Sequence, residues 1–103
     1  MNVSPFSSII VLKDYYLVEE FFNAALALRQ FDWATFFLQM TRARYPKAIK
    51  TMRMLAMFYE CQGELVKAQE ILLDLISEDP TDSQTLKRLI ALYRDMDMEA
   101  QAI

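Results

Sequence analysis

The sequence of 103 residues has no histidine and only one cysteine, and these two shortages exclude most kinds of catalytic or metal site. Histidine is the commonest general base and metal ligand, so neither an acid–base centre nor a zinc site is expected. Cys61 has no second cysteine for an internal disulfide, which is typical of a reducing, cytosolic setting. Because glycine-rich phosphate loops and nucleophile motifs are also missing, the sequence predicts a protein that is not an enzyme and binds no cofactor or metal.

Long apolar runs are missing as well. The longest mainly apolar stretch runs from Phe21 to Leu28, is interrupted by Asn23, and falls far short of the roughly 20 residues that a membrane-spanning helix needs. The opening Met1–Leu12 lacks the cationic start of a secretory signal, and residues 1–14 are interpreted as an N-terminal leader. We therefore expect no membrane span. Acidic residues outnumber basic ones, 14 to 11, so nucleic acid is not expected as a partner.

Glycine occurs once and proline three times, and no alternating apolar pattern is long enough for a strand. Apolar residues, 54% of the chain, recur instead at helical spacing. The last helix is expected to begin with a capping box formed by Thr81 and Gln84. We therefore expect an all-α fold with about five helices, at residues 14–29, 32–44, 48–62, 65–78 and 82–96.

The strongest signal in the sequence is an internal repeat. Pro46 recurs as Pro80, and Ala34 recurs as Ala68 and Ala102, at one constant interval. Each proline ends a helix, because proline disfavours helical geometry at the residue before it. Alanine is expected where paired helices cross closely, since a larger side chain would push them apart. Predicted packing positions recur in the same register: Val18, Phe21, Ala25 and Leu38; Met52, Leu55, Tyr59 and Leu72; and Leu86, Leu89 and Tyr93.

The interval of about 34 residues, with two antiparallel helices in each unit, is that of the tetratricopeptide repeat (TPR). We therefore expect a TPR helical-hairpin solenoid, a right-handed α-α superhelix, over residues 15–103. Its repeats would cover residues 15–48 and 49–82. A partial repeat, residues 83–103, would stop a few residues into its second helix.

The turns agree less well with a single repeated pattern. Gly63 lies where a helix C-terminus needs a left-handed residue, whereas its counterparts are Arg29 and Asp97. The first turn must therefore close differently or carry strain. Acidic residues around Pro80, among them Asp82, are interpreted as solvated turn residues rather than as a cation site.

The first helix of each TPR pair lines a concave groove, where ligands usually lie. The side chains expected to point into this groove and bind a partner are Tyr16, Glu19, Asn23, Lys50, Arg53, Met57, Glu60, Gln84, Lys87 and Arg94. Basic residues around Met57 would suit a protein or peptide segment with a few carboxylates and an apolar anchor. Charges of this kind also occur on any solvated helix face, and that alternative stays open. A clamp for a C-terminal carboxylate is not expected, because Glu19 would repel it.

Several residues are not required by the common repeat: Arg53, Met57, Glu60, the run Glu78-Asp79-Pro80-Thr81, and Lys87-Arg88. Through these residues the chain resembles one TPR family in particular, that of subunit 2 of the endoplasmic reticulum membrane protein complex. The resemblance implies a scaffold without enzymatic activity, on the cytosolic face of the endoplasmic reticulum membrane. It also implies that the partners are other subunits of a membrane-associated complex that supports insertion of membrane proteins. A bound tail would then pass over Arg53, Met57, Glu60 and Lys87.

Three alternatives or additions stay open. One is an unrelated TPR adaptor that binds a peptide segment of a soluble partner. Another is RNA binding by helical-hairpin repeats of about 35 residues, against which the net charge of −3 counts. The third is self-association through the uncapped C-terminal helix, on which Leu89, Leu92 and Tyr93 are expected to be exposed.

Overall fold

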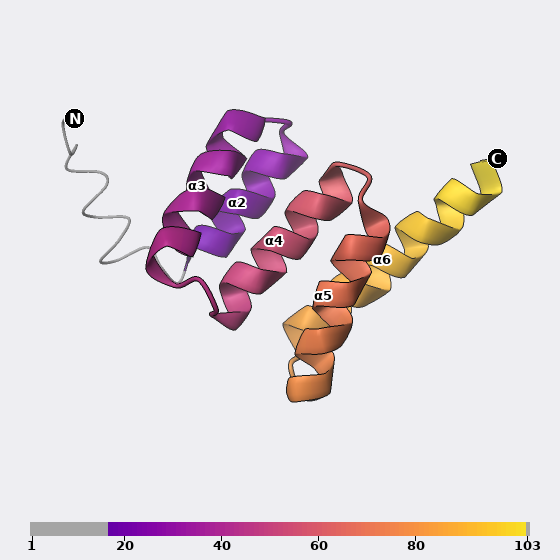
Figure 1. Ribbon diagram of the computed structural model, residues 1–103. Helices are drawn as coiled ribbons and strands as arrows, with labels where there is room; N and C mark the ends of the chain where they lie inside the picture. The colour runs from indigo at the N-terminus through magenta and orange to yellow at the C-terminus, as the bar shows by residue number, and fades with distance from the viewer. Residues whose placement is uncertain (1–16, 103) are drawn as a thin grey trace. The chain divides into compact units, whose positions relative to one another are not determined.

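The computed structural model describes residues 17–102, apart from the side chains at 99, 101 and 102. Within this range it has five α-helices and no strand, which confirms the predicted all-α character for this part of the chain. The predicted leader, residues 1–14, lies outside the described residues. The helices are α2 (Val18–Ala27), α3 (Phe31–Arg44), α4 (Ile49–Cys61), α5 (Leu65–Glu78) and α6 (Ser83–Ala102) (Figure 1).

The chain divides into two compact units, the first ending at Pro46 and the second beginning at Lys47. The first unit contains α2 and α3, which pack against each other as a helical hairpin (Figure 1). The second contains the hairpin of α4 and α5, with α6 packed against both of these helices.

The helix boundaries of the two hairpins repeat at the interval seen in the sequence. α3 begins at Phe31 and ends at Arg44, and α5 begins and ends at the corresponding positions of the next repeat, Leu65 and Glu78. The hydrogen bonds that close the turns repeat as well. Gln30 donates its backbone N–H to the Ala25 carbonyl at 2.8 Å, and the equivalent bond, from Glu64 to Tyr59, measures 2.9 Å. The interval of about 34 residues therefore recurs in the backbone structure of the two hairpins as well as in the sequence.

The two hairpin turns have the same geometry but place different residues in the left-handed region. Arg29 has φ 58°, and Gly63 has φ 83°. The backbone N–H of each residue donates to a carbonyl three residues earlier, at 3.1 Å and 3.0 Å. A residue with a side chain loses about 1–2 kcal/mol in this conformation, whereas glycine does not. The first turn thus carries the strain that its sequence suggested.

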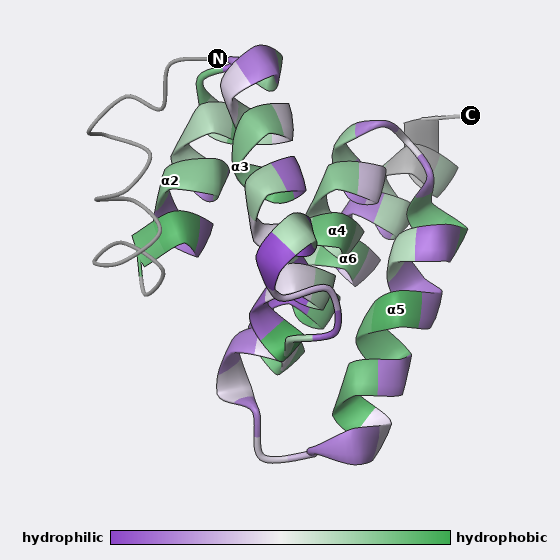
Figure 2. Ribbon diagram, turned by 60° about the vertical axis from the view of Figure 1, so that its left-hand side comes forward, coloured by the Kyte–Doolittle hydropathy of each residue, from purple (hydrophilic) through white to green (hydrophobic). Residues whose placement is uncertain are grey.

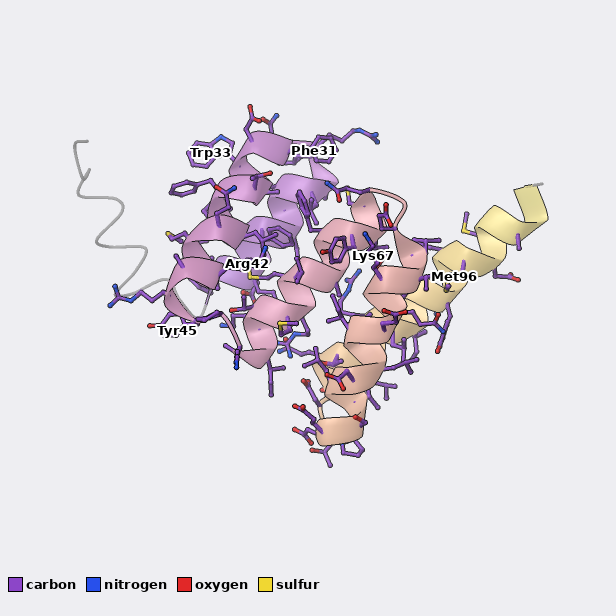
Figure 3. The ribbon with its side chains drawn as sticks, in the orientation of Figure 1. Phe31, Trp33, Arg42, Tyr45, Lys67 and Met96 are labelled. Atoms are coloured by element: carbon purple, nitrogen blue, oxygen red, sulfur yellow. The ribbon has the colours of Figure 1, made fainter. Side chains whose placement is uncertain are left out.

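The buried apolar residues of α2 differ by one from the prediction. Val18, Phe22 and Ala25 are buried, whereas Phe21, which was predicted to pack, is 43% exposed. Phe21 belongs instead to a cluster of four aromatic rings, in which Phe37 stacks on Phe21 at 6.0 Å and on Trp33 at 5.9 Å. The other members contact at their edges: Trp33 with Phe36, and Phe36 with Phe37. Trp33 projects from the start of α3 (Figure 3), with 57% of its surface exposed.

The core of the second unit draws on all three of its helices. One cluster buries Ala56, Ala68, Leu72, Leu75, Leu89 and Leu92 together. Leu89 and Leu92 are buried because α6 packs against α4 and α5, which agrees with the packing position predicted for Leu89 and not with the exposure predicted for both residues. The pattern that makes this packing favourable is visible on α5, whose hydrophobic residues lie along one side and hydrophilic residues along the other (Figure 2).

α6 is longer than the prediction. It continues without interruption to Ala102, although the partial repeat was expected to turn near Asp97 and start a second helix. Asp97 lacks the conformational freedom of Gly63, and the residues from 95 to 102 include no glycine or proline. Alanine, methionine, glutamate and glutamine all favour helix, so nothing ends α6 at that point. Its last turns extend past α5 (Figure 1).

Candidate functional site

The side chains predicted to bind a partner lie in both units. Tyr16 lies outside the described residues. The others lie on α2 (Glu19, Asn23), on α4 (Lys50, Arg53, Met57, Glu60) and on α6 (Gln84, Lys87, Arg94). Because α4 and α6 pack against each other, the structure brings the last two groups together.

These side chains differ in accessibility, so they would not all be open to a partner in the same way. Gln84, Lys87 and Arg94 are exposed, and Asn23, Lys50 and Glu60 are half-buried. Glu19, Arg53 and Met57 are buried. A repeat pattern shows which side of a helix a residue lies on, but neighbouring side chains decide whether a solvent path reaches it.

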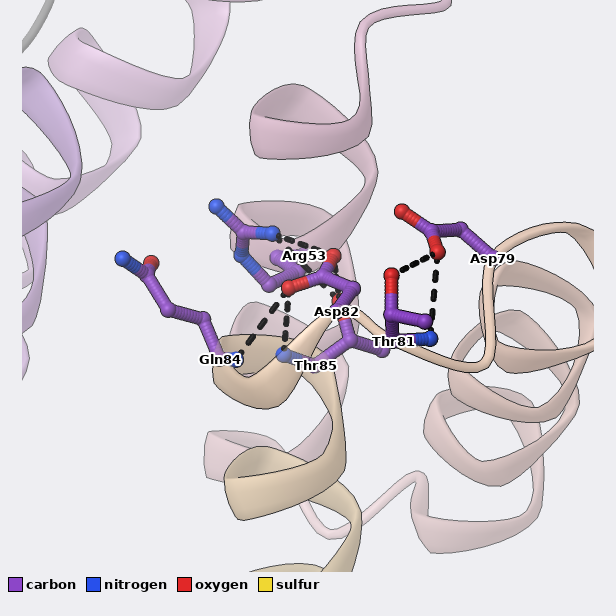
Figure 4. Close-up of polar contacts among 6 residues, drawn as sticks. All are labelled: Arg53, Asp79, Thr81, Asp82, Gln84 and Thr85. Carbon is purple, nitrogen blue, oxygen red and sulfur yellow. Dashed lines mark hydrogen bonds and ion pairs between the residues drawn. The ribbon is translucent and has the colours of Figure 1, made fainter.

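Arg53 forms an ion pair inside the second unit. Its Nη1 lies 2.9 Å from Oδ2 of Asp82 and donates a hydrogen bond to Oγ1 of Thr85 at 3.3 Å (Figure 4). Burial alone would raise the pKa of Asp82, but hydrogen bonds from Thr85 and the nearby Arg53 guanidinium hold that pKa below its usual value. The contact therefore ties the start of α6 to α4.

Asp82 also caps α6. Its Oδ1 accepts hydrogen bonds from the backbone N–H groups of Gln84 at 3.1 Å and Thr85 at 3.3 Å (Figure 4), which have no partner within the helix. Thr81, the predicted capping residue, instead donates its hydroxyl to Asp79 at 2.6 Å. The cap is one residue later than predicted, and Asp82 is a structural residue rather than a solvated turn residue.

A second polar cluster joins α4 and α6 nearer their C-terminal ends. Burial and a hydrogen bond with the Asp95 carboxyl raise the pKa of Glu60 to about 7, and the positive charge of Arg88 only partly opposes this. Nε of Arg88 is buried and finds no hydrogen-bond partner in the described part of the chain. The Glu60 carboxyl therefore releases its proton near neutral pH, and the charge of this region becomes more negative as that proton leaves.

We define the α4–α6 face as a set of exposed and half-buried residues, Lys50, Glu60, Gln84, Lys87, Arg88, Arg94 and Asp95, together with the buried Arg53 and Met57. The repeat pattern did not indicate Asp95, because the equivalent residues one and two repeats earlier, Cys61 and Ala27, carry no charge. Arg88 was indicated by the run Lys87-Arg88 that resembles the TPR family above. The face offers charges of both signs, several of them exposed, and this suits binding of a charged polypeptide.

The described residues form neither a metal-binding cluster nor a membrane-spanning helix. Nowhere in this range do three or more histidine, cysteine, aspartate or glutamate side chains gather so that they could hold a metal ion. None of the five helices is both long and apolar enough to cross a membrane.

In comparisons with known proteins, no protein-family model matches the chain and no curated protein matches its sequence. The candidate site is therefore defined by its own residues and contacts.

Proposed function

We propose that the chain is a TPR-type scaffold that binds segments of other proteins and catalyses no reaction. The observation that supports this proposal best is the repetition of helix boundaries and turn hydrogen bonds from one hairpin to the next, in step with the sequence. Ala34 and Ala68, which occupy the same place in the two repeats, are both fully buried, as close helix crossings require. Repeats of this kind, stacked as a right-handed superhelix, commonly form extended binding surfaces.

The surface proposed to bind is the α4–α6 face. Lys87 and Arg94 are exposed there, so an acidic segment of a partner would gain favourable contacts without displacing an internal ion pair. Arg53 and Met57 are buried and would act by supporting α4 rather than by touching the partner.

The setting we propose follows the family resemblance. The partners would be other subunits of the endoplasmic reticulum membrane protein complex, and the chain would act on the cytosolic face of that membrane. The alternative is an unrelated TPR adaptor with a single soluble partner.

Affinity purification of the tagged chain from cells, followed by mass spectrometry, tests whether the chain binds other proteins and whether it does so through the α4–α6 face. Several membrane-embedded proteins recovered together are expected, while one soluble partner would favour the adaptor. Reversing two exposed charges, in Lys87→Glu/Arg94→Glu, should lower recovery by about tenfold, because the variant repels an acidic segment. Lys47→Glu is the control, since Lys47 is also exposed but lies outside the face. Equal recovery with the double variant and this control would move binding elsewhere.

A further inference from the structure

One side of α6 is apolar and exposed, although equivalent residues of α2 and α4 are covered. Leu86, Ile90 and Tyr93 of α6 are 44%, 45% and 42% exposed. They lie at i, i+4 and i+7, so they form one stripe along the helix. We call this stripe the outer face of α6.

The internal repeat identifies the equivalents of this stripe. One repeat earlier they are Met52, Ala56 and Tyr59 of α4, which pack into the core cluster of the second unit together with Ala68 and Leu72 of α5. Two repeats earlier they are Val18, Phe22 and Ala25 of α2, all of them buried. In both hairpins this stripe of the first helix is thus covered, and among α2, α4 and α6 only α6 leaves it exposed.

The helices that follow α2 and α4 show what kind of helix fits such a stripe. α3 buries Ala34, Leu38 and Thr41, and α5 buries Ala68, Leu72 and Leu75. Both helices therefore place alanine first, leucine four residues later, and a third buried residue after three more. Alanine permits close approach of the backbones, and the two larger residues fill the space on either side of the crossing.

α5 adds a charged contact to this pattern. Lys67, the residue before its buried alanine, places Nζ 5.5 Å from the centre of the Tyr59 ring, within the range of a cation–π interaction. The equivalent ring on α6 is that of Tyr93. A helix with lysine before the alanine would meet that ring in the same way.

We propose that the outer face of α6 binds one amphipathic α-helix of a partner protein, carrying the pattern Lys-Ala-x-x-x-Leu-x-x-Leu. A second copy of this chain is a poorer occupant, because the helices with such a pattern, α3 and α5, already bury it internally. Residues 98–102 belong to α6 itself and so do not turn back over its outer face. The outer face of α6 consists of other residues than the α4–α6 face, so an experiment can contradict one binding proposal without contradicting the other.

A synthetic peptide with the α5 sequence, residues 62–79, is the probe, because α5 covers the equivalent stripe of α4. Labelled peptide titrated with the full chain should bind saturably, as measured by fluorescence anisotropy. Ile90→Asp should weaken binding about tenfold or more, because it removes apolar contact and buries a carboxylate. Leu86→Asp, at the other end of the stripe, should act alike. A peptide with Leu72→Asp should not bind.

Val66→Asp is the matched control, since Val66 is also exposed and apolar but lies on α5 outside the stripe. Circular dichroism should show unchanged helix content for all three chain variants, whose altered residues are exposed. The proposal would be overturned if the peptide does not bind, or if Ile90→Asp and Val66→Asp reduce its binding equally. A dimer of the chain, measured by sedimentation equilibrium, would also overturn the proposal if Ile90→Asp dissociates it and the peptide does not bind. The outer face of α6 would then bind a second copy of the chain.

Discussion

Arg29 and Gly63 occupy equivalent places in two turns, and the backbone there is left-handed in both. Replacing Arg29 by glycine should therefore stabilise the first unit, whereas Gly63→Ala should destabilise the second by about 1 kcal/mol. Nothing lies within 4 Å of a Cβ added at Gly63, so the second effect would come from the backbone alone.

Arg29 also contacts the Phe31 ring, at 5.9 Å, and any substitution loses that contact. Arg29→Ala is the matched control, because it loses the contact but keeps a side chain at positive φ. Urea unfolding should show the glycine variant to be more stable than the alanine variant by about 1 kcal/mol. Equal stability of these two variants would mean that the turn relaxes and stores no strain.

The accessibility of single residues was the least predictable property of the site. The repeat period placed Arg53 on the correct helix but gave no sign that Asp82, far along the chain, would pair with it. Met57 is likewise buried, although its position in the repeat suggested that it would contact an apolar anchor residue of the partner. Charge reversal at Arg53 would place a carboxylate beside Asp82, so it would disturb folding rather than test partner binding.

At the scale of one helix, the start of α6 depends on Asp82, which both caps the helix and pairs with Arg53. Asp82→Ala should lower the free energy of unfolding of the second unit by about 1–3 kcal/mol, because it removes the cap of two backbone N–H groups and the ion pair with the buried Arg53. Thermal unfolding followed by circular dichroism measures this effect. Ser83→Ala, an exposed change next to the cap, should have an effect within about 0.5 kcal/mol. Similar effects of the two changes would contradict the assigned role of Asp82.

Helix positions were predictable because proline, glycine and apolar spacing act locally. α3, α4 and α5 begin and end within a residue of the predicted bounds. The end of α6 was not predictable in this way, because a repeat pattern implies a turn at Asp97 only if the residue there can adopt it. Local helix preference decided the outcome, and the same straight course leaves Leu86, Ile90 and Tyr93 exposed.

For the molecule as a whole, Glu60 should make stability depend on pH. Its pKa rises from 4.5 to about 7 in the folded chain, so between these values the folded state holds a proton that the unfolded state has released. The free energy of unfolding should therefore fall as pH rises through this interval. Asp82 has the opposite sign: its pKa is lowered on folding, so its contribution is lost in acid, as pH falls below the usual aspartate value of 3.8 and through the folded pKa.

Urea unfolding at several values between about pH 5 and about pH 8 measures the slope due to Glu60. Glu60→Gln should flatten the slope, because glutamine has no proton to release in this range. Glu70→Gln, on the exposed side of α5, is the control and should leave the slope unchanged. A slope that persists in Glu60→Gln would assign the titration to another group.

The ring cluster in the first unit also gives the protein a built-in optical label. Trp33 is the sole tryptophan of the chain, and the second unit contains none. Its emission therefore monitors melting of α2 and α3, while far-ultraviolet ellipticity sums over every helix. Denaturation curves recorded by the two signals would coincide if both halves melt together, and would separate if each half melts by itself.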